Sequence, residues 1–231
     1  MKFTKRIIAA FLCVSALASC CRSSEELPAE VYEILKNIKE PTFRQVDYPV
    51  TDFGAVADSV TDCRKAINDA ITKCSDDGGG RVVLPQGKVF CKGCINIKSN
   101  VNLYIPEGCE LIFSSDPLDY LPAELTVWEG TELYNYASFI RSDHCNNIAI
   151  TGKGIINGNA KTTFARMRPQ RSAQQDTLRQ MGIDLVPVRD RYFGARSIMP
   201  PNMIEPFGCK NVLIEGVTIH DSPYWVIHPL F

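Results

Sequence analysis

A short motif that recurs three times constrains the fold of this chain more than any other feature. Each copy reads Asn, apolar, any residue, apolar, and a second short strand begins soon after it; the copies start at Asn100, Asn147 and Asn211. The intervals are 47 and 64 residues, and removing the 40-residue polar stretch 159–198 from the longer one leaves 24. Both intervals therefore fit a period near 24, which is typical of a solenoid built from stacked coils.

Short runs rich in Val, Ile and Leu, separated by Gly or Asn, are interpreted as the strands of these coils. They cover residues 81–84, 94–97, 101–105, 110–113, 138–141, 148–151, 154–156, 212–214 and 217–219. In a solenoid each strand pairs with its counterparts in the coils above and below, so apolar side chains stack inward. Asn suits the turns because it tolerates left-handed backbone and can bond to the Asn of the next coil.

One amphipathic helix is expected over residues 61–75, with Thr61 or Asp62 as its cap. Its apolar face carries Ala66, Ile67, Ala70, Ile71 and Cys74, and three glycines follow it. Such a helix would cover the open edge of the first coil. The fold expected is therefore all-β, a parallel β-helix with an N-terminal capping helix; a β-sandwich is the alternative, although sandwiches rarely keep a fixed repeat.

The first twenty residues read as an export signal. Basic residues precede an apolar run over 7–18, and the run ends in Leu17-Ala18-Ser19-Cys20, which resembles the lipobox of bacterial lipoproteins. We expect a signal peptide over 1–20, a lipid anchor that ties Cys20 to a membrane, a tether with a short helix over 21–48 and the main domain over 49–231. The chain would be a cell-envelope lipoprotein of the periplasm or outer membrane; the alternative is an ordinary cleaved signal with a chance Cys.

Cysteine usage argues against both a disulfide scaffold and a metal site. Of the ten cysteines, Cys13, Cys20 and Cys21 lie in or beside the signal. The other seven are an odd number at mostly irregular spacing: Cys63, Cys74, Cys91, Cys94, Cys109, Cys145 and Cys209. Cys91 and Cys94 form a lone CxxC, whereas structural zinc needs four ligands. We expect most of these thiols to be buried, and no metal or cofactor. The alternative in an exported protein is a pairing of Cys91 with Cys94 or of Cys63 with Cys74.

Charge is balanced overall but not locally. The chain has 25 basic and 26 acidic side chains, which argues against a nucleic-acid binder. Residues 159–198, however, hold eight basic and three acidic residues, a local charge of +5. Arg forms forked hydrogen bonds with carboxylates, so Arg166, Arg168 and Arg196 are candidate contacts for an acidic ligand. A solvated surface loop is the alternative.

Trp225 and His228 lie together near residue 231, on or beside a strand. A Trp can stack on a sugar face through its large apolar surface, and a partly exposed His can bind a polar group. Both are candidate ligand-binding residues. The alternatives are a core Trp and a His that is simply hydrogen-bonded.

Five segments in order, over residues 50–231, resemble landmarks of family 28 glycoside hydrolases, the polygalacturonases. They are Thr51-Asp52-Phe53-Gly54-Ala55 with Ser59-Val60-Thr61-Asp62, Gly78-Gly79-Gly80-Arg81-Val82-Val83-Leu84-Pro85, Lys98-Ser99-Asn100-Val101-Asn102-Leu103, Ile150-Thr151-Gly152-Lys153-Gly154-Ile155-Ile156-Asn157-Gly158 and Ser222-Pro223-Tyr224-Trp225-Val226-Ile227-His228-Pro229. The resemblance implies a right-handed parallel β-helix of the pectin-lyase-like type. It also implies a glycosidase that hydrolyses α-1,4 bonds of pectic polysaccharide or oligogalacturonide with inversion, and we expect a monomer.

The catalytic motifs implied by the resemblance do not occur in the chain. The family's Asn-Thr-Asp, Asp-Asp, Gly-His-Gly and Arg-Ile-Lys motifs follow its Ser-Pro-x-Trp segment, and the Asp76-Asp77 pair here instead follows the first helix. An inverting hydrolase needs both a general acid and a general base, so we expect the catalytic aspartates beyond Phe231 and the 231-residue chain alone to be inactive. The alternative function is a non-catalytic surface module that binds acidic polysaccharide through its Arg-rich loop. A lyase would need a Ca²⁺-binding carboxylate cluster, and none is visible.

Overall fold

This computed structural model describes residues 27–231. The chain divides into two compact units, with the boundary between Lys39 and Glu40. The first unit contains the helix α2 (Ala29–Asn37), none of whose residues is buried. The predicted signal peptide and the anchor at Cys20 lie outside the described residues. Within residues 27–231 no helix is long and apolar enough to cross a bilayer.

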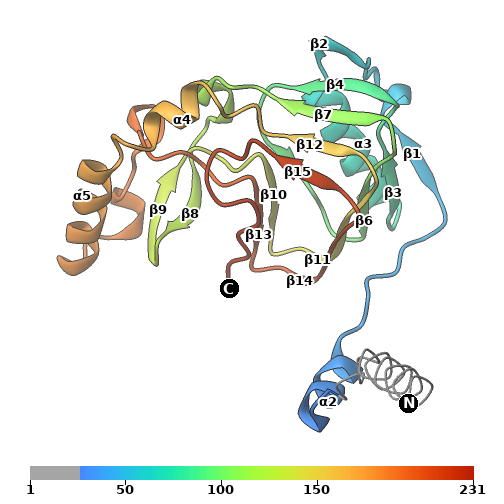
Figure 1. Cartoon of the computed structure of the whole chain (residues 1–231), viewed down its shortest axis with the longest axis horizontal. Helices are drawn as coiled ribbons and strands as arrows, with labels where there is room; N and C mark the ends of the chain where they lie inside the picture. Colours follow the sequence, from blue (N-terminus) through green and yellow to red (C-terminus); the bar gives the residue numbers. More distant parts are fainter. Residues whose placement is uncertain (1–26) are drawn as a thin grey trace, which may run out of the picture. The chain divides into compact units, whose positions relative to one another are not determined.

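The second unit is a parallel β-helix with three sheets (Figure 1). Sheet A contains, in chain order, β1 (Asp47–Pro49), β3 (Gly80–Val83), β6 (Val101–Ile105), β11 (Asn146–Gly152) and β14 (Lys210–Glu215). Sheet B contains β2 (Asp58–Asp62), β4 (Gly87–Cys91), β7 (Cys109–Phe113), β12 (Ile155–Asn157) and β15 (Thr218–His220). Sheet C contains β5 (Ile95–Asn96), β10 (Ile140–Asp143) and β13 (Ile204–Phe207). The predicted fold class is confirmed.

Apolar ladders fill the inside of the solenoid. Alternate residues of β6 are fully buried, and Leu103 pairs with Val82 of one neighbouring coil and with Ile150 of the other. Ile150 in turn pairs with Ile214. Because each inward position stacks on the same position of the next coil, the strands alternate between buried and more exposed residues.

The three recurring Asn residues form a ladder at one turn of the solenoid. Asn100, Asn147 and Asn211 all have left-handed backbone, with φ of 63°, 59° and 58°. The amide Nδ2 of Asn147 donates to Oδ1 of Asn100 at 3.3 Å, and Nδ2 of Asn211 donates to Oδ1 of Asn147 at 3.0 Å. Both roles predicted for Asn are therefore confirmed.

The predicted period of about 24 residues is wrong, because the coils differ in length. β6 pairs directly with β11, so the 47 residues between Asn100 and Asn147 make one coil and not two. The coil before it is shorter, since Arg81 pairs with Asn102. The extra residues form a hairpin of β8 (Glu124–Trp128) and β9 (Thr131–Asn135), and in the following coil they form α4 (Thr163–Met167) and α5 (Ser172–Ile183).

Both insertions leave the solenoid at the same turn, between sheet B and sheet C, and they lie on the same side of it (Figure 1). They pack on each other through a second, small apolar cluster of Trp128, Leu133, Leu178 and Met199. Four short 3₁₀ helices complete the unit: Val50–Phe53, Pro117–Tyr120, Val188–Asp190 and Gly194–Arg196. The insertions thus make a structured wall beside sheet C.

The predicted capping helix is α3 (Arg64–Asp76), and its five expected apolar residues are all buried. In chain order α3 stands where a sheet C strand would otherwise follow β2. The side chain of Asn68 compensates for that missing strand: its Nδ2 donates to the carbonyl of Cys94 at 3.1 Å, and its Oδ1 accepts from the N–H of Asn96 at 2.8 Å. The free edge of β5 is therefore hydrogen-bonded by a helix side chain.

The seven cysteines of the described region are all free thiols. Burial raises the pKa of Cys94 and of Cys109 to about 12, and that of Cys74 to about 11. These groups are protonated at neutral pH and behave as small apolar side chains. Within residues 27–231 no group of three His, Cys, Asp or Glu residues is arranged to hold a metal ion.

Candidate functional site

A row of polar side chains runs across the outer face of sheet C. The register pairs Asn96 with Arg141 and Arg141 with Glu205, while the isoleucine before each of these three residues faces the core. A further bridge, Ile204 to Ile227, continues the sheet and places His228 next to Glu205. We call Asn96, Arg141, Glu205 and His228 the polar ladder.

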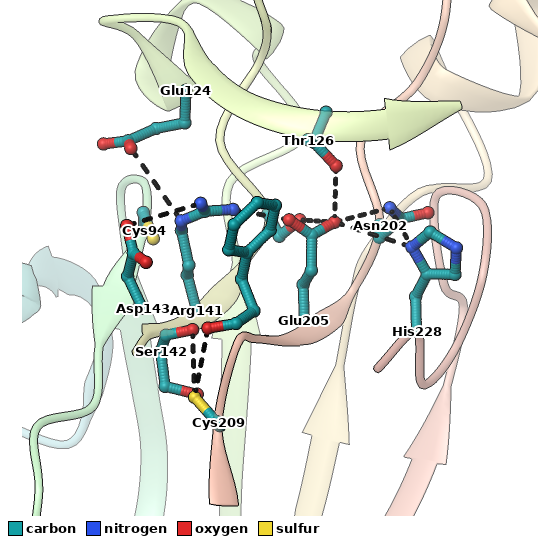
Figure 2. Close-up of polar contacts among 12 residues, drawn as sticks. Cys94, Glu124, Thr126, Arg141, Ser142, Asp143, Asn202, Glu205, Cys209 and His228 are labelled. Atoms are coloured by element: carbon teal, nitrogen blue, oxygen red, sulfur yellow. Dashed lines mark hydrogen bonds and ion pairs between the residues drawn. The ribbon is translucent and has the colours of Figure 1, made fainter. Parts of the chain in front are cut away.

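The hairpin β8–β9 covers the middle of the polar ladder (Figure 2). Only 3% of the Arg141 side chain and none of Glu205 is exposed. Thr126 of the hairpin donates its hydroxyl to Oε2 of Glu205 at 2.8 Å, and the carboxylate of Glu124 lies 3.8 Å from Nε of Arg141. Two ionised groups are therefore kept out of water, which is tolerated only because they are paired and hydrogen-bonded.

The carboxylate of Glu205 is saturated with donors. Its Oε1 accepts from Nη1 of Arg141 at 2.5 Å, and its Oε2 accepts from Thr126, from Ser138 at 3.0 Å and from Nδ2 of Asn202 at 2.7 Å. Burial alone would raise the pKa of Glu205, but the hydrogen bonds from Asn202 and Thr126 and the charge of Arg141 outweigh it, so the pKa is lowered. Glu205 is an ionised acceptor with no capacity left for a ligand.

At the end of the polar ladder the side chains become accessible. The His228 side chain is 20% exposed, and its ring stacks on Trp225, with centroids 6.2 Å apart and planes 9° from parallel. Trp225 is half exposed. Its neighbour Tyr224 is fixed from the other side, since it stacks on Trp128 at 4.3 Å and donates its hydroxyl to Glu129 at 3.0 Å. Trp225 and His228 thus form an exposed aromatic surface on a rigid support.

The structure brings together some of the residues expected to bind a ligand. Trp225 and His228 lie side by side. Arg168 donates to the carbonyls of Ser222 at 2.7 Å and Pro223 at 3.1 Å, so it supports the segment that carries Trp225. Arg168 also lines a hollow of about 400 Å³ together with Lys161, Asp221 and Tyr224.

Other basic residues of the Arg-rich loop are distributed differently. Arg166 and Arg196 are exposed, and among the contacts described for residues 27–231 neither touches Trp225 or His228. Lys161 pairs with Asp221 and Arg179 with Glu129, each at 3.0 Å. Part of the +5 charge is therefore neutralised within the protein.

Sequence reasoning missed the central residues of the polar ladder. Arg141 stands in a run that was expected to be a strand, and its outward position is what strand alternation predicts. Glu205 is a single acid within the apolar stretch that becomes β13, and a charge in such a stretch is itself a signal of a buried pair. The hairpin that covers them could not be placed from local pattern, because Thr126 and Glu205 are 79 residues apart.

Comparison with known proteins agrees with this architecture. The family model "Rhamnogalacturonase A/epimerase, pectate lyase-like" matches residues 48–104. A probable polygalacturonase of Vitis vinifera is 23% identical over 97% of this chain and 41% of its own length.

Two solved structures with related sequences share the fold. The hyperthermoactive exopolygalacturonase of Thermotoga maritima superposes with a TM-score of 0.82 at 35% identity, covering 86% of this chain and 47% of that one. The family 28 exopolygalacturonase of Yersinia enterocolitica superposes with a TM-score of 0.56 at 26% identity, covering 81% of this chain and 36% of that one.

The chain spans less than half the length of these relatives. Within that span, this chain forms a three-sheeted solenoid with two insertions and a Ser-Pro-x-Trp segment at residues 222–225. The resemblance expected from the sequence is confirmed: this is a parallel β-helix protein similar to the polygalacturonases of glycoside hydrolase family 28.

Proposed function

We propose that this chain forms the N-terminal coils of an exported glycoside hydrolase that cleaves α-1,4-galacturonosidic bonds of pectic polysaccharide with inversion. The observation that carries the proposal is the pair Trp225 and His228, exposed at the end of the polar ladder in a fold similar to that of an exopolygalacturonase. A partly exposed aromatic ring beside a few polar groups is the usual composition of a sugar site. Lipid attachment at Cys20 in the cell envelope belongs to the same proposal.

We assign no catalytic role to any residue within 27–231. Inversion requires a carboxylic acid and a carboxylate on opposite sides of the sugar with room for water. Glu205 is the one fully buried carboxylate of the polar ladder, and its donors leave it unable to reach a substrate. The proposal therefore places the catalytic aspartates outside residues 27–231 and gives this part of the protein the role of holding the substrate.

Action from the end of a polymer is the mode that we propose. The hairpin and the helical insertion stack into one wall beside sheet C, next to the residues that would hold the sugar. A wall at that position limits how far a polymer extends past the site. The two solved relatives reported above are both named exopolygalacturonases.

The second candidate function is a non-catalytic module that binds acidic polysaccharide. It is favoured by Arg166 and Arg196, whose exposed side chains have no acidic partner among residues 27–231. Affinity for polygalacturonate that falls steeply with salt, and that survives loss of Trp225, would support this module over the hydrolase.

The test of the proposed function is a titration of the chain with digalacturonate, followed by tryptophan fluorescence. Trp225 is exposed while the other Trp, Trp128, is buried, so the signal reports on the proposed site. We expect a saturable change that W225F abolishes and W128F retains, with no response to neutral galactobiose. Binding without release of reducing ends agrees with the proposal, whereas no response to digalacturonate in the unsubstituted protein contradicts it.

A further inference from the structure

The side chain of Asn202 connects the buried part of the polar ladder to its exposed end. Asn202 is 4% exposed. Its Nδ2 lies 2.7 Å from Oε2 of Glu205 and 2.9 Å from Nδ1 of His228 (Figure 2). One NH₂ group therefore faces both a carboxylate oxygen and a ring nitrogen.

The ionised Glu205 fixes which way this amide points. A carboxylate only accepts hydrogen bonds, so the NH₂ of Asn202 and not its carbonyl must face Oε2. The reversed amide would bring two buried oxygen acceptors together at 2.7 Å. Arg141 and Thr126 hold the carboxylate itself, which makes the orientation of Asn202 a consequence of the buried ion pair.

The amide orientation then fixes the ring of His228. An NH₂ group has two hydrogens; one goes to Glu205, and the second points at Nδ1 of His228. Nδ1 must accept it, so in the neutral ring Nε2 carries the hydrogen. Glu205 offers no competing acceptor for an Nδ1 hydrogen, because its Oε2 lies 3.7 Å from Nδ1 and already accepts three bonds.

We infer that Asn202 and Glu205 are positioning residues that lock His228 as the Nε2–H tautomer, so that it offers a hydrogen-bond donor to a uronic acid lying on Trp225. The second ring nitrogen of His228 lies on the side away from Asn202 and Glu205 (Figure 2). Among residues 27–231 it has no hydrogen-bond partner. The natural acceptor is a carboxylate or hydroxyl oxygen, and this identification of the ligand rests on the proposed function.

The tautomer can be measured without any ligand. The chain has three histidines, so H144Q/H220Q leaves His228 as the only imidazole. We expect ¹⁵N-detected NMR of this protein at neutral pH to show an unprotonated Nδ1 and a protonated Nε2. A protonated Nδ1 would overturn the inference, whatever the protein binds.

A matched pair of variants tests the role of Asn202. In N202D the new acid must keep its proton, which it donates to Glu205, and the same oxygen can then only accept at Nδ1 of His228. We therefore expect the proton of His228 to move to Nδ1 and the affinity for digalacturonate to fall roughly tenfold or more. N135D is the control, because Asn135 is equally buried and its Nδ2 donates to the carbonyl of Met199 instead. An N202D protein that keeps the Nε2–H form contradicts the positioning role.

A hydrogen bond from His228 to the ligand can be measured separately from the tautomer. Addition of digalacturonate should shift the Nε2 resonance of His228. If the fluorescence of Trp225 responds and Nε2 does not, the donor role of His228 is wrong while the proposed function stands. If neither responds, the proposed function fails, and the tautomer result is unaffected.

Discussion

Nη1 of Arg141 lies 2.5 Å from Oε1 of Glu205, and the two side chains are enclosed between sheet C and the inserted hairpin. This pair joins two coils that are 64 residues apart in sequence. A second carboxylate lies close to the arginine, since Oδ2 of Asp143 is 3.7 Å from Nη2 of Arg141. The ion pair therefore links the folding of two coils of the solenoid to the correct placement of the residues proposed to bind sugar.

Replacing only one member of this ion pair should strongly destabilise the domain. R141M leaves Glu205 buried without its counter-charge, and the free energy of unfolding should fall by about 3–5 kcal/mol. Urea denaturation followed by circular dichroism measures the change. The double variant R141M/E205Q should recover much of the loss, because the neutral amide removes the unpaired charge while its oxygen still accepts from Thr126 and Ser138. A double variant less stable than R141M would refute this explanation.

Acid should destabilise the protein partly through Glu205. Its pKa is lowered in the folded state relative to the ordinary value of 4.5, so the folded protein holds this proton less tightly than the unfolded chain does. The resulting stability is present above the unfolded pKa and is lost as pH falls through the folded value. Urea midpoints measured from pH 7 to pH 3 should fall less steeply for E205Q than for the unsubstituted protein.

The control for this pH dependence is D47N. Asp47 also has a lowered pKa, because of its hydrogen bonds with Arg81, but its side chain is about half exposed. Replacing Asp47 should therefore change the slope of the urea midpoint against pH less than replacing Glu205 does. Equal pH slopes in E205Q and the unsubstituted protein would show that Glu205 contributes nothing to acid sensitivity.

The Asn ladder predicts that two substitutions of Asn147 lower the free energy of unfolding by different amounts. N147A must hold alanine in left-handed backbone and loses the ladder bonds, so it should cost about 1–2 kcal/mol for the backbone plus about 1 kcal/mol for each bond. N147G loses the same bonds but accepts the backbone conformation. Thermal denaturation should rank N147G above N147A. The reverse order would mean that φ at this turn is not the constraint.

The capping helix predicts a local effect at the edge of β5. N68A removes both the donor to the carbonyl of Cys94 and the acceptor for the N–H of Asn96. The free energy of unfolding should therefore fall by about 1–3 kcal/mol. Hydrogen exchange of the Asn96 amide should become faster. D69A is the matched control, because Asp69 is the next helix residue and its salt bridge within the described part of the chain is to the exposed Lys65. Unchanged exchange at Asn96 in N68A would contradict the role given to this side chain.

The sequence predicted those parts of the fold that depend on local pattern. The turn role of Asn147 followed from its side chain and its recurrence, and the buried face of α3 followed from helical spacing. The hairpin could not be predicted, since its residues alternate like those of a coil strand and only contacts across the chain distinguish the two. The same limit applies to Glu205, whose partners Thr126 and Arg141 come from separate coils. Trp225 and His228 were singled out by residue type, but Asn202 acquires its role only from the geometry around it.

The strand register of the sheets stays constant although the coils differ in length. The core of the solenoid and the connections between its strands can therefore change independently of each other. Leu103 stacks on Ile150 as regularly as on Val82, although one coil carries an inserted hairpin and the other does not. The cost of closing a longer loop grows only slowly with its length, and the ladders inside the solenoid are indifferent to it. The connection between sheets B and C can therefore gain or lose whole elements without refolding the core. A protein built this way can acquire a new specificity by lengthening one turn while its stability is inherited unchanged.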